Sequence, residues 1–130
     1  MKKKTLLSWS SGKDSAWTLH CLKQNPDIQI IGLFTSANQK YNRPSMHATR
    51  LEMLEKQAHA AGYPLRIIHL PEPCTDNQYA IIMKQFITAS VDQGIECMAF
   101  GDLFLAGIRQ YREDQLKGTG IEPIFPLWGI

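Results

Sequence analysis

The sequence has neither a large excess of charge nor a long apolar run. It carries 14 lysines and arginines against 12 aspartates and glutamates, so the formal net charge of its 130 residues is only +2. No segment approaches the ~20 apolar residues of a membrane-spanning helix. The apolar stretch behind the basic N-terminus ends at Ser8, too early for a signal peptide. We therefore expect a cytoplasmic protein whose charge favours neither a membrane nor a nucleic acid as partner.

Cysteine is also scarce, and its spacing argues against two common kinds of site. Cys21, Cys74 and Cys97 lie far apart and form no Cys-x-x-Cys pair, so neither a zinc ribbon nor a disulfide framework is indicated. Cys21 and Cys97 lie in apolar patterns and are predicted to be small core residues. Cys74 follows a proline and stays a candidate nucleophile. With 44% hydrophobic and 20% charged residues, the chain has the composition of one globular domain.

The stretch from Ser8 to Ser15 is the most informative part of the sequence. It reads Ser-Trp-Ser-Ser-Gly-Lys-Asp-Ser, between the apolar run Thr5 to Leu7 and a helical pattern that starts at Lys13. This predicts a strand, a tight turn and a helix. A helix N-terminus presents unpaired backbone N–H groups and partial positive charge, so it suits an anion. The stretch is not a Walker A loop, because Leu7 stands where that motif needs glycine and Asp14 follows the lysine.

The residues of the turn fit an anion such as phosphate. Ser10 and Ser11 are small and can donate hydrogen bonds, and Gly12 can adopt backbone conformations that other residues avoid. Lys13 adds a positive charge where the helix dipole disfavours one, a conflict that an anionic partner resolves. Asp14 can either support the helix N-terminus or hold a cation. The structural alternative is an ordinary strand–helix turn with a solvated lysine.

The rest of the chain alternates strand and helix patterns. Apolar runs predict strands over residues 5–8, 28–34, 65–70, 97–100 and 121–127. Helical patterns predict helices over residues 13–23 and 46–61, from a Thr75 cap to Gly94, and over residues 103–117. This alternation predicts one α/β domain with a five-stranded parallel sheet, helices on both faces and the common strand order 3-2-1-4-5.

Several local features set the limits of these elements. Gly62 and Gly118 follow helical patterns and are expected to end them. Thr75 and Gln78 have the spacing of a capping box. Residues 36–45 are polar and predict a loop after the second strand. The residues of the first helix that are expected to pack on the sheet are Ala16, Trp17, Leu19, Cys21 and Leu22.

A ligand-binding crevice is predicted where the strand order reverses. In such sheets ligands bind beyond the carboxyl ends of the strands, here between the first and fourth strands. The turn of residues 8–15 and the pair Gly101-Asp102, which ends the fourth strand, should face this crevice. Asp14 and Asp102 are candidate Mg²⁺ ligands, because that cation prefers oxygen ligands.

The last helix carries a second group of charged residues. Arg109 and Arg112 are neighbours on its surface, and Glu113 can pair with Arg109. Arginine forks suit phosphate or carboxylate. Arg112 lies in register with Ile108 on an otherwise apolar stripe, so its charge needs a partner. The structural alternative is a solvated face on which nearby carboxylates satisfy both arginines.

The turn also resembles the PP-loop of the ATP pyrophosphatases. That signature is Ser-Gly-Gly-x-Asp-Ser, and residues 10–15 read Ser-Ser-Gly-Lys-Asp-Ser, with Ser11 in place of the first glycine. By resemblance, the loop would hold the β- and γ-phosphates of ATP, and cleavage would fall between the α- and β-phosphates.

Further segments resemble the diphthine–ammonia ligase family within that superfamily. They are Gly101-Asp102-Leu103, the Arg109–Glu113 segment and Pro126-Leu127-Trp128. Residues 8–15 and 46–48 are most similar to the bacterial branch, and the match covers the family's N-terminal nucleotide-binding portion. These motifs occur in the family's order along nearly the whole chain.

The resemblance implies a Rossmann-like, adenine nucleotide alpha hydrolase-like fold and an ATP-dependent ligase. ATP would be cleaved to AMP and pyrophosphate with Mg²⁺, and an unknown carboxylate would be activated for attack by ammonia. The residues that would bind the nucleotide are Ser10, Ser11, Gly12, Lys13, Asp14, Ser15 and Gly101. The residues that would serve the reaction are Lys13, Asp102, Arg109, Arg112 and Glu113, with Asp14 and Asp102 as the metal ligands.

Alternatives to this function stay open. Family members continue into a C-terminal region with a Gly-Glu-x-Gly-Glu-like motif that these 130 residues do not contain, so we expect nucleotide binding ahead of turnover. A non-catalytic adenine-nucleotide-binding module is the main alternative, and a tRNA-modifying enzyme would want a basic face and a working cysteine. His47 is either a substrate contact or structural, Trp9 is expected in the core, and a homodimer is one of the open oligomeric states.

Overall fold

The computed structural model describes residues 2–9, 13–38, 46–71, 73–101 and 106–128. The strands are β1 (Lys3–Ser8), β2 (Ile28–Asn38), β3 (Leu65–Leu70), β4 (Cys97–Ala99) and β5 (Glu122–Ile124). The helices are α1 (Lys13–Lys23), α2 (Met46–Ala61), α3 (Asp76–Asp92) and α4 (Ala106–Leu116). None of the helices in these ranges is long and apolar enough to cross a membrane.

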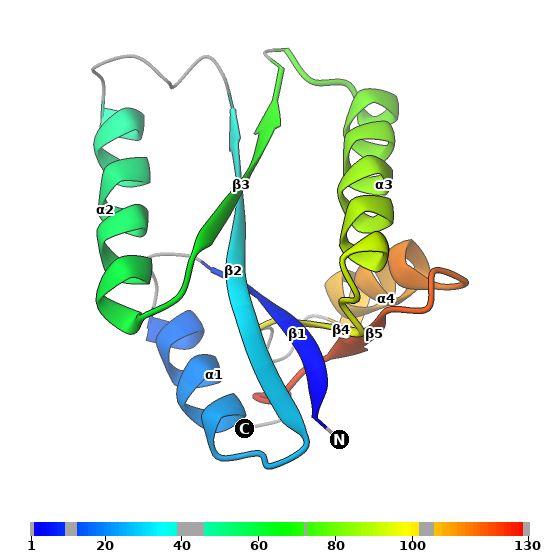
Figure 1. Ribbon diagram of the computed structural model, residues 1–130. Helices are drawn as coiled ribbons and strands as arrows, with labels where there is room; N and C mark the ends of the chain where they lie inside the picture. The colour runs from blue at the N-terminus through cyan, green and yellow to red at the C-terminus, as the bar shows by residue number, and fades with distance from the viewer. Residues whose placement is uncertain (1, 10–12, 39–45, 72, 102–105, 129–130) are drawn as a thin grey trace.

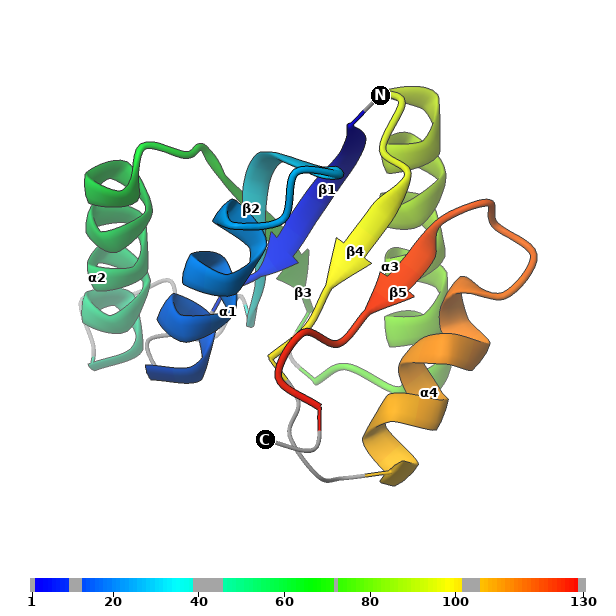
Figure 2. The ribbon, with the colours of Figure 1, turned by 90° about the horizontal axis from the view of Figure 1, so that it is seen from below.

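All five strands form one parallel sheet, which the helices cover on both faces. The strand order is β3-β2-β1-β4-β5, which confirms the predicted topology. Helices α1 and α2 cover one face, and α3 and α4 cover the other (Figures 1 and 2). The order reverses at β1, so the crevice expected between β1 and β4 lies at the carboxyl edge of the central strands.

The sheet separates two apolar cores. Successive side chains of a strand point to opposite faces, and Leu6 and Leu7 of β1 accordingly contribute to different cores. The core under α1 and α2 contains Leu54 and Ala58 of α2, both fully buried or nearly so. The core under α3 and α4 contains Met83, Ile87, Met98, Phe100 and Leu116. Each pair of helices is thus fixed to its own face of the sheet.

The predicted helix limits are confirmed where the structure describes them. Thr75 Oγ1 accepts from the backbone N–H of Gln78 at 3.1 Å, and the backbone N–H of Thr75 donates to Gln78 Oε1 at 2.9 Å. This capping box contributes ~1 kcal/mol to the start of α3. Gly62 and Gly118 have φ of +87° and +78°, the left-handed conformation that ends helices at glycine.

Three predicted details are wrong. The last strand, expected over residues 121–127, is only Glu122–Ile124. β2 continues to Asn38, because Ala37 and Asn38 pair with β3, so residues 36–38 are strand and not loop; residues 39–45 lie outside the described residues. The buried face of α1 is also shifted from the predicted one. Trp17 is 46% exposed and Ala16 is exposed, whereas Thr18 is fully buried. Thr18 can point inward because its hydroxyl donates to a carbonyl of its own helix.

Candidate functional site

The carboxyl end of β1 leads directly into the predicted phosphate-binding loop. The backbone N–H of Trp9 donates to the carbonyl oxygen of Phe34 at 2.8 Å, so the chain follows the sheet one residue past β1. Helix α1 begins at Lys13, as predicted. The predicted site residues outside the described part are Ser10, Ser11, Gly12, Asp102 and the side chain of Lys13. The structure therefore supports a helix N-terminus at this edge, and the roles of these residues stay predictions.

Gly101 brings the end of β4 against the first turn of α1. A Cβ atom at Gly101 would lie 3.0 Å from Thr18 Oγ1 and 3.4 Å from the carbonyl oxygen of Asp14. Thr18 is fully buried, and its hydroxyl donates to that same carbonyl at 2.6 Å. A Cβ at position 101 would therefore need Thr18 or this turn to give by a few tenths of an ångström. Asp14 and Gly101 thus lie side by side, as the crevice prediction requires.

Thr18 is a residue of this site that the sequence analysis missed. Its spacing of four residues from Asp14 was a usable signal, because a helical threonine commonly bonds the carbonyl four residues earlier. Ser15, in the same turn, is 6% exposed, and the Asp14 side chain is half-buried. Among the described residues, no group of three His, Cys, Asp or Glu side chains could hold a metal ion. A cation at Asp14 would accordingly take further oxygen ligands from phosphate.

Arg109 is held by groups of the protein on three sides. Its Nε donates to Glu113 Oε1 at 3.3 Å, which confirms the predicted pairing. Its guanidinium carbon also lies 4.6 Å from the ring centroid of Phe125 and 4.9 Å from that of Trp128. Cations over aromatic faces are attracted by ~0.5–1 kcal/mol at exposed sites. Arg109 therefore joins α4 to the segment that follows β5.

Arg112 lies against a different ring. Its guanidinium carbon is 4.3 Å from the ring centroid of Phe100. An aromatic ring is thus one partner of the charge that was predicted on this face of α4. Ile108, which was expected on the same inward stripe, is 40% exposed. Phe100 in turn packs edge-on against Phe34 at 6.2 Å and stacks on Phe125 at 5.7 Å.

These rings form a row along the carboxyl edge that the sequence analysis did not predict. Phe100 directly follows β4, Phe125 directly follows β5, and Phe34 lies in β2. A signal was available, since a phenylalanine follows the last residue of two neighbouring strands. The row gives both arginines of α4 a flat apolar surface.

A recess of about 240 Å³ opens at this edge, between the strand ends and the helices α3 and α4. Its polar lining residues are Ser8, Thr35, Ser36, Tyr79, Arg112 and Gln115. Trp9 also borders it, so the recess adjoins the predicted loop directly. Trp9 is 6% exposed, as expected for a core residue, and its indole Nε1 has no hydrogen-bond partner in the described part of the chain. We call this cavity the carboxyl-edge recess.

The structure describes all three cysteines, and Cys97 is poorly suited to act as a nucleophile, whereas the role of Cys74 stays a prediction. Cys97 is buried as predicted, and burial, reinforced by the nearby Glu122 carboxylate, raises the pKa of its thiol. Cys21 and Cys74 are half-buried, and all three are free thiols. A raised pKa lowers the thiolate fraction that attacks electrophiles. The side chain of His47 lies outside the described residues.

Comparison with known proteins places this site in a family context. The model of the family described as the diphthamide synthase N-terminal domain matches residues 2–121. None of the curated proteins compared with the chain matches it. Among solved structures, the U34-tRNA thiolase NcsA from Methanococcus maripaludis, solved with its 4Fe–4S cluster, is similar with a TM-score of 0.61 and 18% identity. The match covers 99% of this chain and 54% of the thiolase, so this chain spans about half the length of that protein.

Two further structures are more distant. A protein of the universal stress protein family from Burkholderia pseudomallei has a TM-score of 0.48 at 8% identity, covering 95% of this chain and 94% of that one. Formyltetrahydrofolate deformylase from Burkholderia mallei ATCC 23344 has a TM-score of 0.44 at 19% identity, covering 78% of this chain and 30% of that one. Neither likeness carries an argument about this chain. The likeness to the thiolase shows a shared fold, a Rossmann-like α/β sheet, and the family match supports the PP-loop superfamily.

Proposed function

Because the chain belongs to the diphthamide synthase N-terminal domain family, we propose that it binds ATP at the carboxyl edge of its sheet and activates a carboxylate for ammonia. The observation that carries the proposal is the close approach of Gly101 to the first turn of α1. It sets the end of β4 beside the helix N-terminus on which the phosphates would lie. The carboxyl-edge recess borders Ser8 and Trp9 and would give the reacting partner a place next to that loop.

The proposed reaction has two steps. A carboxylate oxygen attacks the α-phosphorus of ATP, and an O–P bond forms as the bond from that phosphorus to pyrophosphate breaks. Ammonia then attacks the acyl carbon, so that a C–N bond forms, AMP leaves with the electrons of the broken C–O bond, and a proton passes to solvent. The products are an amide, AMP and pyrophosphate.

The chain's residues would serve this reaction chiefly through electrostatics. The N-terminus of α1 and the charge of Lys13 would hold the departing pyrophosphate. Asp14, with phosphate oxygens, would hold Mg²⁺, and the ion would supply positive charge to the leaving pyrophosphate. Arg112 lines the recess and would meet the carboxylate, with its guanidinium carbon over the ring of Phe100.

Arg109 takes a different part in this proposal from the one expected at first. The contacts of its guanidinium go to Phe125, Trp128 and Glu113, so we assign it to positioning α4 rather than to touching the substrate. Glu113 orients Arg109 through its carboxylate. The pair therefore supports Arg112, one helical turn further along α4, by fixing the helix against the strand ends.

The test is an analysis of the nucleotides after incubation. The chain is mixed with ATP and Mg²⁺, with and without ammonium and a panel of carboxylic acids, and the nucleotides are separated by chromatography. AMP and pyrophosphate that depend on an added carboxylate would support the proposal. ATP that is bound but stays intact would contradict catalysis and support a non-catalytic adenine-nucleotide-binding module. Absence of ATP binding would contradict both.

A further inference from the structure

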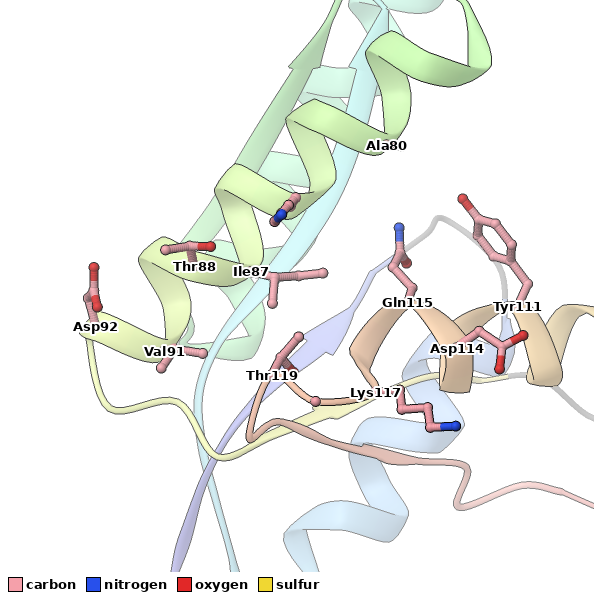
Figure 3. A pocket seen from close by; sticks show the side chains of 12 residues that line it. Ala80, Ile87, Thr88, Val91, Asp92, Tyr111, Asp114, Gln115, Lys117 and Thr119 are labelled. Carbon is pink, nitrogen blue, oxygen red and sulfur yellow. The ribbon is translucent and has the colours of Figure 1, made fainter.

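A second, larger cavity lies outside the site described so far. A groove of about 670 Å³ runs along the seam between α3 and α4 (Figure 3). On the α3 side it is lined by the small or apolar side chains of Ala80, Ile87 and Val91, and on the α4 side by Tyr111 and Gln115. Val91 is 40% and Tyr111 is 48% exposed, so apolar surface lies open here.

The groove and the carboxyl-edge recess adjoin each other. Ile87 of α3 and Gln115 of α4 line both cavities. Figure 3 shows these two side chains on facing sides of the gap between the helices. Ile87 and Gln115 thus form the wall between them, and a molecule with one end beside Arg112 in the recess and the other between α3 and α4 would pass these two side chains.

We propose that the carboxylate activated by this protein is a small molecule with an extended apolar tail. The inference rests on the function proposed above and names its substrate class. The carboxylate group would lie in the recess at Arg112, and the tail would lie in the groove against Ala80, Ile87 and Val91. The head would thereby be near the loop that holds ATP.

The position of Arg112 favours a carboxylate as the head group of the substrate. The guanidinium carbon of Arg112 lies 4.3 Å from the centroid of the Phe100 ring, at the lining of the recess. Two donors of a guanidinium match the two oxygens of a carboxylate. The hydroxyls of Ser36 and Tyr79 add polar groups to the same recess.

The tail follows from the chemistry of the groove. Most of its lining surface is apolar, although Thr88 and Gln115 also contribute to it. Each methylene group buried there strengthens binding about fourfold. The rims carry charges of both signs, Lys84 and Lys117 against Asp92 and Asp114, so they do not select a polyanion such as a nucleic acid. A recess of about 240 Å³ admits one chemical group of limited size rather than a folded surface.

The test uses decanoate and butyrate as probes in titration calorimetry with the whole chain, with Mg²⁺ and a non-hydrolysable α,β-methylene analogue of ATP. We expect decanoate to bind at least ten times more tightly than butyrate. Ala80→Trp places a large ring in the groove and should weaken decanoate binding at least tenfold. Ala89→Trp is the matched control, because Ala89 is also exposed on α3 but does not line the groove.

Each result separates this inference from the proposed function. If the ATP analogue binds but decanoate does not, or if Ala89→Trp weakens decanoate as much as Ala80→Trp, the inference is overturned and ATP binding stands. If decanoate and the ATP analogue exclude each other, the recess holds the nucleoside and the inference is likewise overturned. If the ATP analogue does not bind at all while decanoate binding still depends on Ala80, the proposed function fails instead.

Discussion

The two faces of the sheet differ in how they are filled. Under α1 and α2, the leucine side chains Leu7, Leu33 and Leu54 are fully buried. Under α3 and α4, a row of aromatic rings reaches the carboxyl edge. The carboxyl-edge recess lies at that edge, and the groove lies between α3 and α4 on the same face. Aliphatic side chains interdigitate, whereas aromatic rings can also hold cations on their faces.

This difference suggests that the two faces of the sheet have different functions. The face under α1 and α2 holds α1 in place, and the N-terminus of α1 would hold the phosphates. For that role α1 needs only a fixed position on the sheet. On the face under α3 and α4, Arg112 lies over the ring of Phe100 and lines a cavity. A binding partner needs both a cavity and a charged group of this kind. Gly101 connects the two faces of the sheet. It packs directly on α1, and the chain continues from it to α4 and β5.

The largest effect is expected from Phe100→Ala. This ring is 4% exposed and contacts Phe34, Phe125 and Arg112, so its loss should lower the free energy of unfolding by ~3–5 kcal/mol, as for other buried aromatic residues. Urea unfolding measures this value. Leu54→Ala, on the other face, should cost ~2–5 kcal/mol.

Phe100→Leu tests the difference between the two faces of the sheet. It keeps most of the apolar volume but removes the ring beneath Arg112. We expect it to be more stable than Phe100→Ala and yet to lose binding of a carboxylate probe. A Leu54→Ala protein that stays folded should keep that binding. Equal loss of binding in Leu54→Ala and Phe100→Leu would contradict the division between the faces.

Gly101→Ala should have the next largest effect. Its new Cβ would lie 3.0 Å from Thr18 Oγ1, which a hydrogen bond of 2.6 Å holds in place, so we expect a loss of ~1–3 kcal/mol in unfolding free energy. Thr18→Ala removes that oxygen. The double variant should therefore be less destabilised than the sum of the two single variants. Strict additivity in thermal or urea unfolding would show that the two residues are not in contact.

The smallest effect is expected from Arg109→Lys. Lysine keeps the charge but loses the planar group that lies over Phe125 and Trp128, so stability should fall by about 1 kcal/mol. Gln110→Lys, at an exposed neighbouring position of α4, is the control and should stay within ~0.5 kcal/mol of the parent. A melting temperature of Arg109→Lys equal to that of the parent would contradict the positioning role of Arg109.

The sequence predicted the architecture well, because it depends on patterns that act over short distances. The alternation of apolar runs with helical patterns predicted every strand and helix of the described residues, and the Thr75 capping box and the glycines that end two helices agree with the predicted helix limits. The inward turn of Thr18 was missed, because a threonine in a helix satisfies its hydroxyl locally, and the pattern of apolar residues does not record this.

The site was less predictable, because it depends on contacts between distant segments. The Arg109–Glu113 pair follows from spacing along one helix and was predicted. The stacking of the arginines on Phe100, Phe125 and Trp128 joins α4 to the ends of β4 and β5, and only the folded sheet sets that distance. The groove between α3 and α4 likewise arises from the angle between two helices, which no local pattern encodes.

The most direct measurement is the calorimetric titration of ATP with Mg²⁺ into the parent chain, Lys13→Ala and Lys23→Ala. Lys13 begins α1 beside the predicted phosphates, whereas Lys23 is exposed at the other end of the same helix. We expect the parent and Lys23→Ala to bind ATP alike and Lys13→Ala to bind about a hundredfold more weakly, a loss of ~3 kcal/mol, with unchanged melting temperatures. Equal ATP affinity in all three proteins would contradict a phosphate site at the N-terminus of α1.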